Sequence, residues 1–158
     1  MTSRFTVLQN AIASRLSALG PIKSPPNKDS NFLDSLVVPV DTTAQGDWRK
    51  AVSIKIQQVG LGILVRKGNY SYKAPVETYP FIVEIVETPV LNRGALGTQL
   101  SAELAMEAVT EGIRNWSPAE WTGECEDVRV ESKEGKQQLT YVVAFKVRAH
   151  VNERTREL

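Results

Sequence analysis

The stretch "VEIVETPVLNRGALGTQLSAELA", residues 83–105, passes from a strand-like run through a turn with two glycines into a helix-like run. Backbone N–H groups at the start of a helix can bind an anion, so the turn is a candidate phosphate site. The motif rules do not support it: Gly94 and Gly97 are too close for a phosphate loop, no lysine follows, and neither begins a G-x-G. We therefore expect a structural connector, with Thr98 as the N-cap of the helix.

Length and composition indicate an ordinary globular chain. With 158 residues it fits one domain, which we expect to cover residues 1–158. Hydrophobic residues at 42% and charged residues at 23% are close to the globular average, which argues against wholesale disorder and against a fibrous repeat. The net charge of +1 argues against nucleic-acid binding over the whole surface, and no specific nucleic-acid binding is expected.

The use of cysteine favours a reducing compartment, and the N-terminus does not fit the pattern of a signal peptide. Cys125 is the only cysteine, so no intramolecular disulfide can form. Gln9, Asn10 and Arg15 interrupt the apolar core that a signal peptide at the N-terminus would need. No run approaches the roughly 18 apolar residues of a membrane span, and no membrane partner is expected.

The first half of the chain predicts two helices separated by an irregular segment. Apolar residues at helical spacing begin the chain and stop at Gly20–Pro21: Phe5, Leu8, Ile12, Leu16 and Leu19. Residues 21–46 are rich in proline and turn formers and predict an irregular arm with at most one short strand. Asp47 is the expected N-cap of a short helix that ends at Gly60 and has one apolar face: Trp48, Val52, Ile56 and Val59.

The middle of the chain predicts two strands and a long helix. "LGILVRK", residues 61–67, is a buried-strand candidate, and "YPFIVEIVE", residues 79–87, alternates with an apolar face of Phe81, Val83 and Ile85. We expect residues 68–77 to form the loop between them. The helix is expected from Thr98 to about Asn115, with Gly112 weakening it by about 1 kcal/mol. Its predicted apolar stripe is Leu100, Leu104, Ala108, Val109, Ile113 and Trp116.

The end of the chain predicts a hairpin. Apolar residues occupy the odd positions from Leu139 to Val151, which is the period of a half-buried strand. "SKEGK" joins this strand to a shorter one that contains Val128 and Val130. The order of elements predicts an α+β fold, with a largely antiparallel sheet of about four strands packed against two or three helices.

Residues with catalytic chemistry are few. His150, the only histidine, falls on the face opposite the apolar stripe, and no cluster has metal-ligand spacing. Cys125 is expected to be a half-buried small residue, although a Cys125–His150 pair across the hairpin stays an open alternative. Glu84 and Glu87 are expected on opposite faces of a strand, in solvated or interfacial positions. We assign no catalytic residue, no cofactor and no metal.

Two charged segments are candidate interfaces. The loop "RKGNYSYKAPVE" interleaves cations with tyrosines: Arg66, Lys67, Tyr70, Tyr72 and Lys73. Such a mixture can bind a nucleic-acid strand, but arginine and tyrosine are equally enriched in protein interfaces, and the low net charge favours a protein partner. The acidic segment at residues 120–131 is either a solvated edge or a contact with a neighbouring subunit.

Residues 83–118, "VEIVETPVLNRGALGTQLSAELAMEAVTEGIRNWSP", resemble the core segment of phage tail terminator (tail completion) proteins. That family tends to carry a strand, an "[EN]xPxxNR" turn, a "GT" and an Ala-rich helix that ends near a "W-x-P". The matching positions are Glu87, Pro89, Asn92, Arg93, Gly97, Thr98, Trp116 and Pro118. The resemblance spans about residues 47–150, and the arm at 21–46 has no counterpart.

The resemblance implies a structural virion protein without enzymatic activity, assembled in the host cytoplasm. Its subunits would form a ring of six that caps the tail tube, ends tube polymerisation and meets the head connector. Asn92, Arg93 and Thr98 are then expected to be exposed polar residues that contact a neighbour, with Arg93 as an anchor. Neck and head-completion proteins and terminators of contractile machines fit the same residues. A small enzyme at the Gly94–Thr98 turn and a nucleic-acid module at the Tyr70 loop are the alternatives from other classes.

Overall fold

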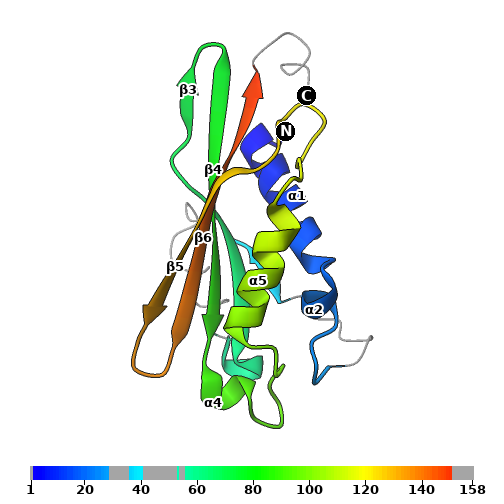
Figure 1. The fold of residues 1–158 in the computed structure, drawn as a ribbon, viewed down its shortest axis with the longest axis vertical. Coiled ribbons are helices and arrows are strands. Elements are labelled where there is room, and N and C mark those ends of the chain that lie inside the picture. The colour runs from blue at the N-terminus through cyan, green and yellow to red at the C-terminus, as the bar shows by residue number, and fades with distance from the viewer. Residues whose placement is uncertain (1, 29–35, 41–52, 54–55, 151–158) are drawn as a thin grey trace.

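The computed structural model describes residues 2–28, 36–40, 53 and 56–150 (Figure 1). The helices with defined bounds are α1 (Arg4–Ser17), α2 (Gly20–Lys23), α4 (Pro89–Asn92) and α5 (Ala102–Ile113). The strands are β1 (Val37–Pro39), β2 (Leu61–Lys67), β3 (Ser71–Lys73), β4 (Val76–Glu87), β5 (Glu126–Glu134) and β6 (Leu139–His150). This content confirms the predicted α+β class.

The strands form one open sheet in the order β1-β2-β4-β6-β5, and β3 pairs with the beginning of β4. In the described part of the chain, β1 runs parallel to its neighbour and the other strand pairs are antiparallel. Within the described residues the sheet has six strands instead of the predicted four or so. The two extra strands are short: β1 lies within the arm, and β3 lies within the segment predicted to be a loop.

Helices α1 and α5 cover one face of the sheet (Figure 1). The core between them contains fully buried residues from both layers, including Leu8 and Ile12 of α1, Phe81 of β4 and Ile113 of α5. Burial of such side chains is the main driving force for the packing. A smaller cluster lies on the opposite face, where Ile56 packs on Leu64 of β2 and Val86 of β4.

Helix α5 differs from the prediction in its start and in its buried face. It begins at Ala102, because the Ser101 side chain accepts a hydrogen bond from the Leu104 N–H at 3.2 Å and caps the first turn. Thr98 is therefore not the N-cap. Leu104, predicted within the apolar stripe, is 55% exposed. The buried positions are mostly small: Ala102, Ala105, Val109, Thr110, Gly112 and Ile113.

Gly112 has a packing role that offsets its low helix propensity. A Cβ atom at this position would lie 2.7 Å from a methyl group of Leu19, so the glycine lets the α1–α2 junction approach α5 closely. Arg15 of α1 donates to the Gly112 carbonyl at 3.0 Å and lies over the Trp116 ring.

Two further boundaries follow from proline and glycine chemistry. Gly20–Pro21 was predicted to stop the first helix, but α1 already ends at Ser17, and Gly20–Pro21 instead begins α2, because proline is favoured in the first helical turn. Residues 56–59 are helical and end at Gly60, which has a φ of +77°. The predicted N-cap at Asp47 and the predicted end of the last strand at Val151 lie outside the described residues.

We predict that Gly60→Ala destabilises the fold by about 3 kcal/mol or prevents folding. The left-handed φ disfavours any side chain, and an added Cβ would lie 2.2 Å from the backbone nitrogen of Asn92. Gly20→Ala is the matched control, since a Cβ there meets nothing within 4 Å. Urea unfolding of the two variants is the measurement. Equal stability of the two would contradict the prediction.

Candidate functional site

The connection between β4 and α5 is built around the buried side chain of Asn92, at the end of α4. Its Nδ2 donates to Oε2 of Glu87 at 2.6 Å and to the Leu100 carbonyl at 2.7 Å. Its Oδ1 accepts from the N–H of Thr98 at 3.2 Å and from the Thr98 hydroxyl. The amide therefore makes all four of the hydrogen bonds that it can make. We refer to Glu87, Asn92 and Thr98 as the Asn92 network.

The Asn92 network corrects two predictions from the sequence. Asn92 and Thr98 were expected to be exposed residues that contact a neighbour, yet both are 0% exposed within the subunit. Glu87 was expected to be solvated or interfacial, and it is also 0% exposed. Asn92 and Thr98 tolerate such burial because their polar atoms are satisfied by hydrogen bonds within the subunit.

Within the Asn92 network, burial of the Glu87 carboxyl group is energetically unfavourable. Its Oε1 atom is buried and has no hydrogen-bond partner among the described residues. Burial of a carboxyl group without full compensation is unfavourable, so Glu87 depends on the one donor that Asn92 supplies to Oε2. The carboxyl group thus makes the identity of residue 92 critical for this end of the molecule.

The turn after α4 uses its backbone N–H groups internally. Gly97 N donates to Gly94 O, Thr98 N to Val59 O, and Gln99 N to Asn92 O. A Cβ atom on Gly97 would lie 2.2 Å from the Asn92 carbonyl oxygen, so the glycine is needed for close backbone approach. These contacts hold the turn that connects β4 to α5.

The arm also supports this turn. Asn27 Nδ2 donates to the carbonyl groups of Ala95 and Gly97 at 2.9 and 2.8 Å. Lys28 Nζ donates to the Leu96 carbonyl at 3.1 Å. The residues after α2 therefore hold the outer side of the turn in place.

The same turn presents apolar side chains to solvent. Val90 is 84% exposed, Leu96 is 78% exposed, and Leu91 is 44% exposed. Arg93, the C-cap of α4, is exposed between them. We call Val90, Leu91, Arg93 and Leu96 the 90–96 patch. Large apolar residues grouped on a rigid turn are typical of a protein-interaction site.

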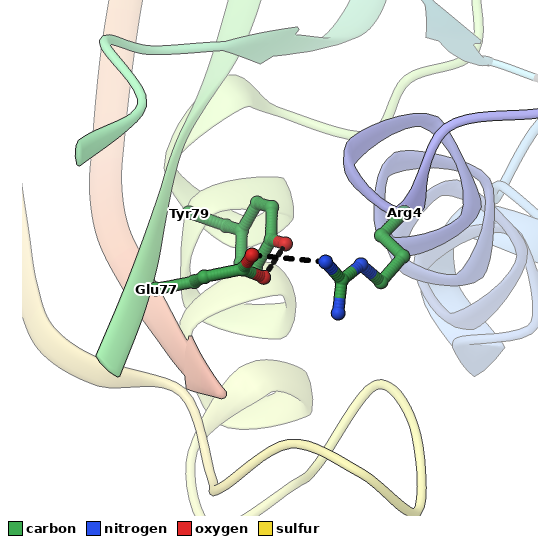
Figure 2. A network of polar contacts seen from close by, with 3 residues as sticks. All are labelled: Arg4, Glu77 and Tyr79. Atoms are coloured by element: carbon green, nitrogen blue, oxygen red, sulfur yellow. Dashed lines mark hydrogen bonds and ion pairs between the residues drawn. The ribbon is translucent and has the colours of Figure 1, made fainter. Parts of the chain in front are cut away.

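The opposite end of the molecule carries a second polar network (Figure 2). Arg4 of α1 donates to Oε1 of Glu77 at 2.9 Å, and the Tyr79 hydroxyl donates to Oε2 of the same carboxylate. Glu77 and Tyr79 are only 5% and 3% exposed. Burial, followed by the contact with Glu77, raises the pKa of Tyr79 well above its ordinary value. The network ties the start of α1 to β4.

The predicted basic and aromatic loop is partly engaged within the subunit. Tyr70 packs against Phe5 and Tyr79, with ring centroids 6.2 and 5.3 Å apart. Lys67 Nζ donates to the Thr6 hydroxyl at 2.7 Å, and Arg66 forms an ion pair with Glu84. Tyr72 and Lys73 are exposed on β3.

The eight predicted interface residues therefore do not form one site. Those of the Tyr70 segment lie at the β3–β4 end, while Asn92, Arg93 and Thr98 lie at the α4 end (Figure 1). Val90, Leu91 and Leu96 were missed by the sequence analysis. Their signal was the presence of large apolar residues inside a turn made mainly of glycine and polar residues.

The remaining candidates are Cys125, His150 and the acidic segment. Cys125 is 8% exposed, and burial raises the pKa of its thiol to about 12, which disfavours the reactive thiolate. His150 is exposed at the end of β6. In the acidic segment, Asp127 pairs with Lys146 at 2.6 Å, which lowers the pKa of Asp127. Glu126 pairs with Arg148 at 3.2 Å.

Searches for metal and membrane features give two findings. The described part of the chain holds no group of three or more His, Cys, Asp and Glu side chains that could bind a metal ion. No helix within the described ranges is long and apolar enough to cross a membrane.

Comparisons with known proteins give a structural likeness but no match at the level of sequence families. No protein-family model matches the chain, and no curated protein sequence matches it. The chain is similar to one in a solved structure of the virion of a native gene transfer agent (GTA) particle. The two are 14% identical over 90% of this chain and 94% of that chain, with a TM-score of 0.49.

We predict that Asn92→Ala lowers the free energy of unfolding by about 3 kcal/mol, because it leaves Glu87 and Thr98 buried without their partner. Asn69→Ala, at an exposed position, is the control and is expected to change stability little. Thermal or urea unfolding measures both. A loss below about 1 kcal/mol for Asn92→Ala would show that the network does not hold this end of the fold.

Proposed function

We propose that this protein is a structural virion protein, a tail terminator whose subunits form a ring of six on the tail tube. In this role it ends tube polymerisation and joins the tail to the head connector. No enzymatic step or cofactor is required. The proposal rests on the resemblance of residues 83–118 to tail terminator proteins and on the part that these residues play in the fold.

The observation that carries the proposal is the structural use of the terminator-like motif. Its Glu87, Asn92 and Thr98 positions form the buried Asn92 network instead of a catalytic site. This network holds in place a turn on which Val90 and Leu96 are exposed. A motif that builds a fixed apolar patch serves assembly with other proteins.

Ring formation needs two different surfaces on each subunit. A head-to-tail interface closes into a ring when the rotation between neighbours allows it. We infer that the 90–96 patch forms one side of a contact with a neighbouring subunit or with the tube. Arg93 is an exposed residue of the patch, and its guanidinium can bind a carboxylate or several carbonyl groups of the partner.

The β3–β4 hairpin is proposed for a different contact, with the next ring of the particle. Tyr72 is 53% exposed and Lys73 is exposed beside it, at the end of the molecule away from the 90–96 patch. We propose that these residues contact the next ring of the particle, either the tube or the connector. Tyrosine offers a large contact area at low conformational cost.

We predict that Val90→Asp combined with Leu96→Asp leaves the subunit folded and abolishes its association with the tail tube. Both side chains are largely exposed, so the changes cost little in stability, while charge in an apolar contact is strongly unfavourable. Leu104→Asp, at an exposed leucine outside the patch, is the matched control. Co-sedimentation of each variant with assembled tubes is the measurement.

Two results of that experiment would contradict the proposal. One is co-sedimentation of the double variant at the wild-type level. The other is failure of the wild-type protein itself to co-sediment with tubes or to form rings on them. A monomer in the absence of tubes contradicts nothing, because the tube can be needed to assemble the ring.

We predict that alanine substitutions of Tyr70 and Tyr72 change different properties of the protein. Tyr72→Ala is expected to keep the wild-type melting curve and weaken attachment to the tube or connector by about 2 kcal/mol, if it truncates a central contact. Tyr70→Ala is expected to lower the melting temperature, because its ring packs on Phe5 and Tyr79. A wild-type yield of complete tails with Tyr72→Ala would remove the hairpin from the interface.

A further inference from the structure

The two edges of the sheet differ in how they are protected. At one edge, β1 is only three residues long and ends with Pro39, features that limit pairing with another strand. At the other edge, β5 is nine residues long, and its residues 129–134 are all exposed. Among the described residues, no strand pairs with the outer side of β5.

The register of the hairpin shows which backbone groups point outward. Gly135 N donates to Gln138 O at 2.8 Å next to the turn. Hydrogen-bonded pairs alternate along an antiparallel ladder, so Lys133, Glu131 and Arg129 bond to β6. The N–H and C=O groups of Val130 and Ser132 therefore point away from β6, toward a strand that would add to this edge.

The side chains of this edge have a self-complementary order. The sequence Arg129-Val130-Glu131 places a cation and an anion symmetrically about Val130. If a second β5 strand runs antiparallel with Val130 opposite Val130, each Arg129 faces a Glu131 of the other copy. Opposite charges at directly facing positions stabilise a strand pair.

We propose that β5 pairs with β5 of a second copy of this chain across a two-fold axis at Val130, which joins the two sheets into one. The outward N–H and C=O groups of Val130 are exchanged between the copies. Val130, a 41% exposed apolar residue, meets its equivalent on the face that carries the helices. Arg129 and Glu131 pair on the opposite face.

The charges also favour this register over the one whose two-fold axis lies at Glu131. Moving the axis from Val130 to Glu131 brings two Glu131 side chains together and places each Arg129 opposite Lys133. Like charges at facing positions are destabilising, so the shifted pairing is disfavoured. The bulge between Glu126 and Arg129 ends the regular edge on one side.

This pairing is independent of the proposed ring. It is an isologous contact that closes after two copies, whereas a ring requires different surfaces on each neighbour. It concerns the free protein, so it can be tested without any tube. Failure of the tube experiment would leave the pairing intact, and failure of the pairing would leave the ring proposal intact.

Charge exchange tests the pairing directly. The dissociation constant of the dimer is measured by sedimentation over a wide concentration range. Arg129→Glu alone and Glu131→Arg alone should each raise it about tenfold or more, because each creates two like-charge contacts. The double variant Arg129→Glu with Glu131→Arg restores the opposite charges and should return to within about threefold of wild type. Lys136→Glu, which changes net charge equally at the hairpin tip, should have little effect.

A backbone test complements the charge test. Val130→Pro removes an outward N–H without removing a ladder bond to β6, so the monomer should fold while the dimer is lost. Hydrogen exchange should show protection of the Val130 amide that grows with concentration. A protein that stays monomeric throughout overturns the proposal. So does a dimer that responds equally to Arg129→Glu and Lys136→Glu, or that survives Val130→Pro.

Discussion

Burial of the Glu87 carboxyl group is the constraint on which the α4 end of the fold depends. A carboxyl group at 0% exposure needs a donor, and the Asn92 amide supplies it while it also binds Thr98 and the Leu100 carbonyl. These contacts fix the end of β4 relative to the start of α5. Gly60 and Gly97 both pack against the backbone of Asn92, at distances that no side chain would allow.

This constraint links the fold to the proposed function. Hydrogen bonds that converge on one buried amide make the turn rigid, and Asn27 and Lys28 hold its outer side. Val90 and Leu96 can then be exposed without collapsing onto the core. A preformed apolar surface loses less conformational entropy on association than a flexible loop would, which suits a subunit that must add to a tube in one orientation.

The sequence predicted the parts of the fold that depend on local periodicity. The alternation in β4 and β6 was readable because strands with one buried face repeat every two residues, and α1 was readable from its helical spacing. Strand β3 was missed because all three of its residues are exposed and show no pattern. The start of α5 was misplaced because Thr98 and Ser101 are both good N-cap residues. In the fold the Thr98 hydroxyl donates to Asn92 and accepts from the Leu100 N–H, whereas Ser101 caps the first turn. The burial of Glu87 could not be foreseen, since its partner is supplied by a turn whose path depends on the whole fold.

The position of the protein in the assembled particle tests the central claim most directly. Asn10 is exposed on α1, so Asn10→Cys can carry a gold label, while burial keeps the Cys125 thiol unreactive. Electron microscopy of complete particles assembled with the labelled protein then gives its location. We expect a ring of label at the end of the tail tube that meets the head. Label along the tube, on the head shell, or absent from purified particles would contradict the proposed role.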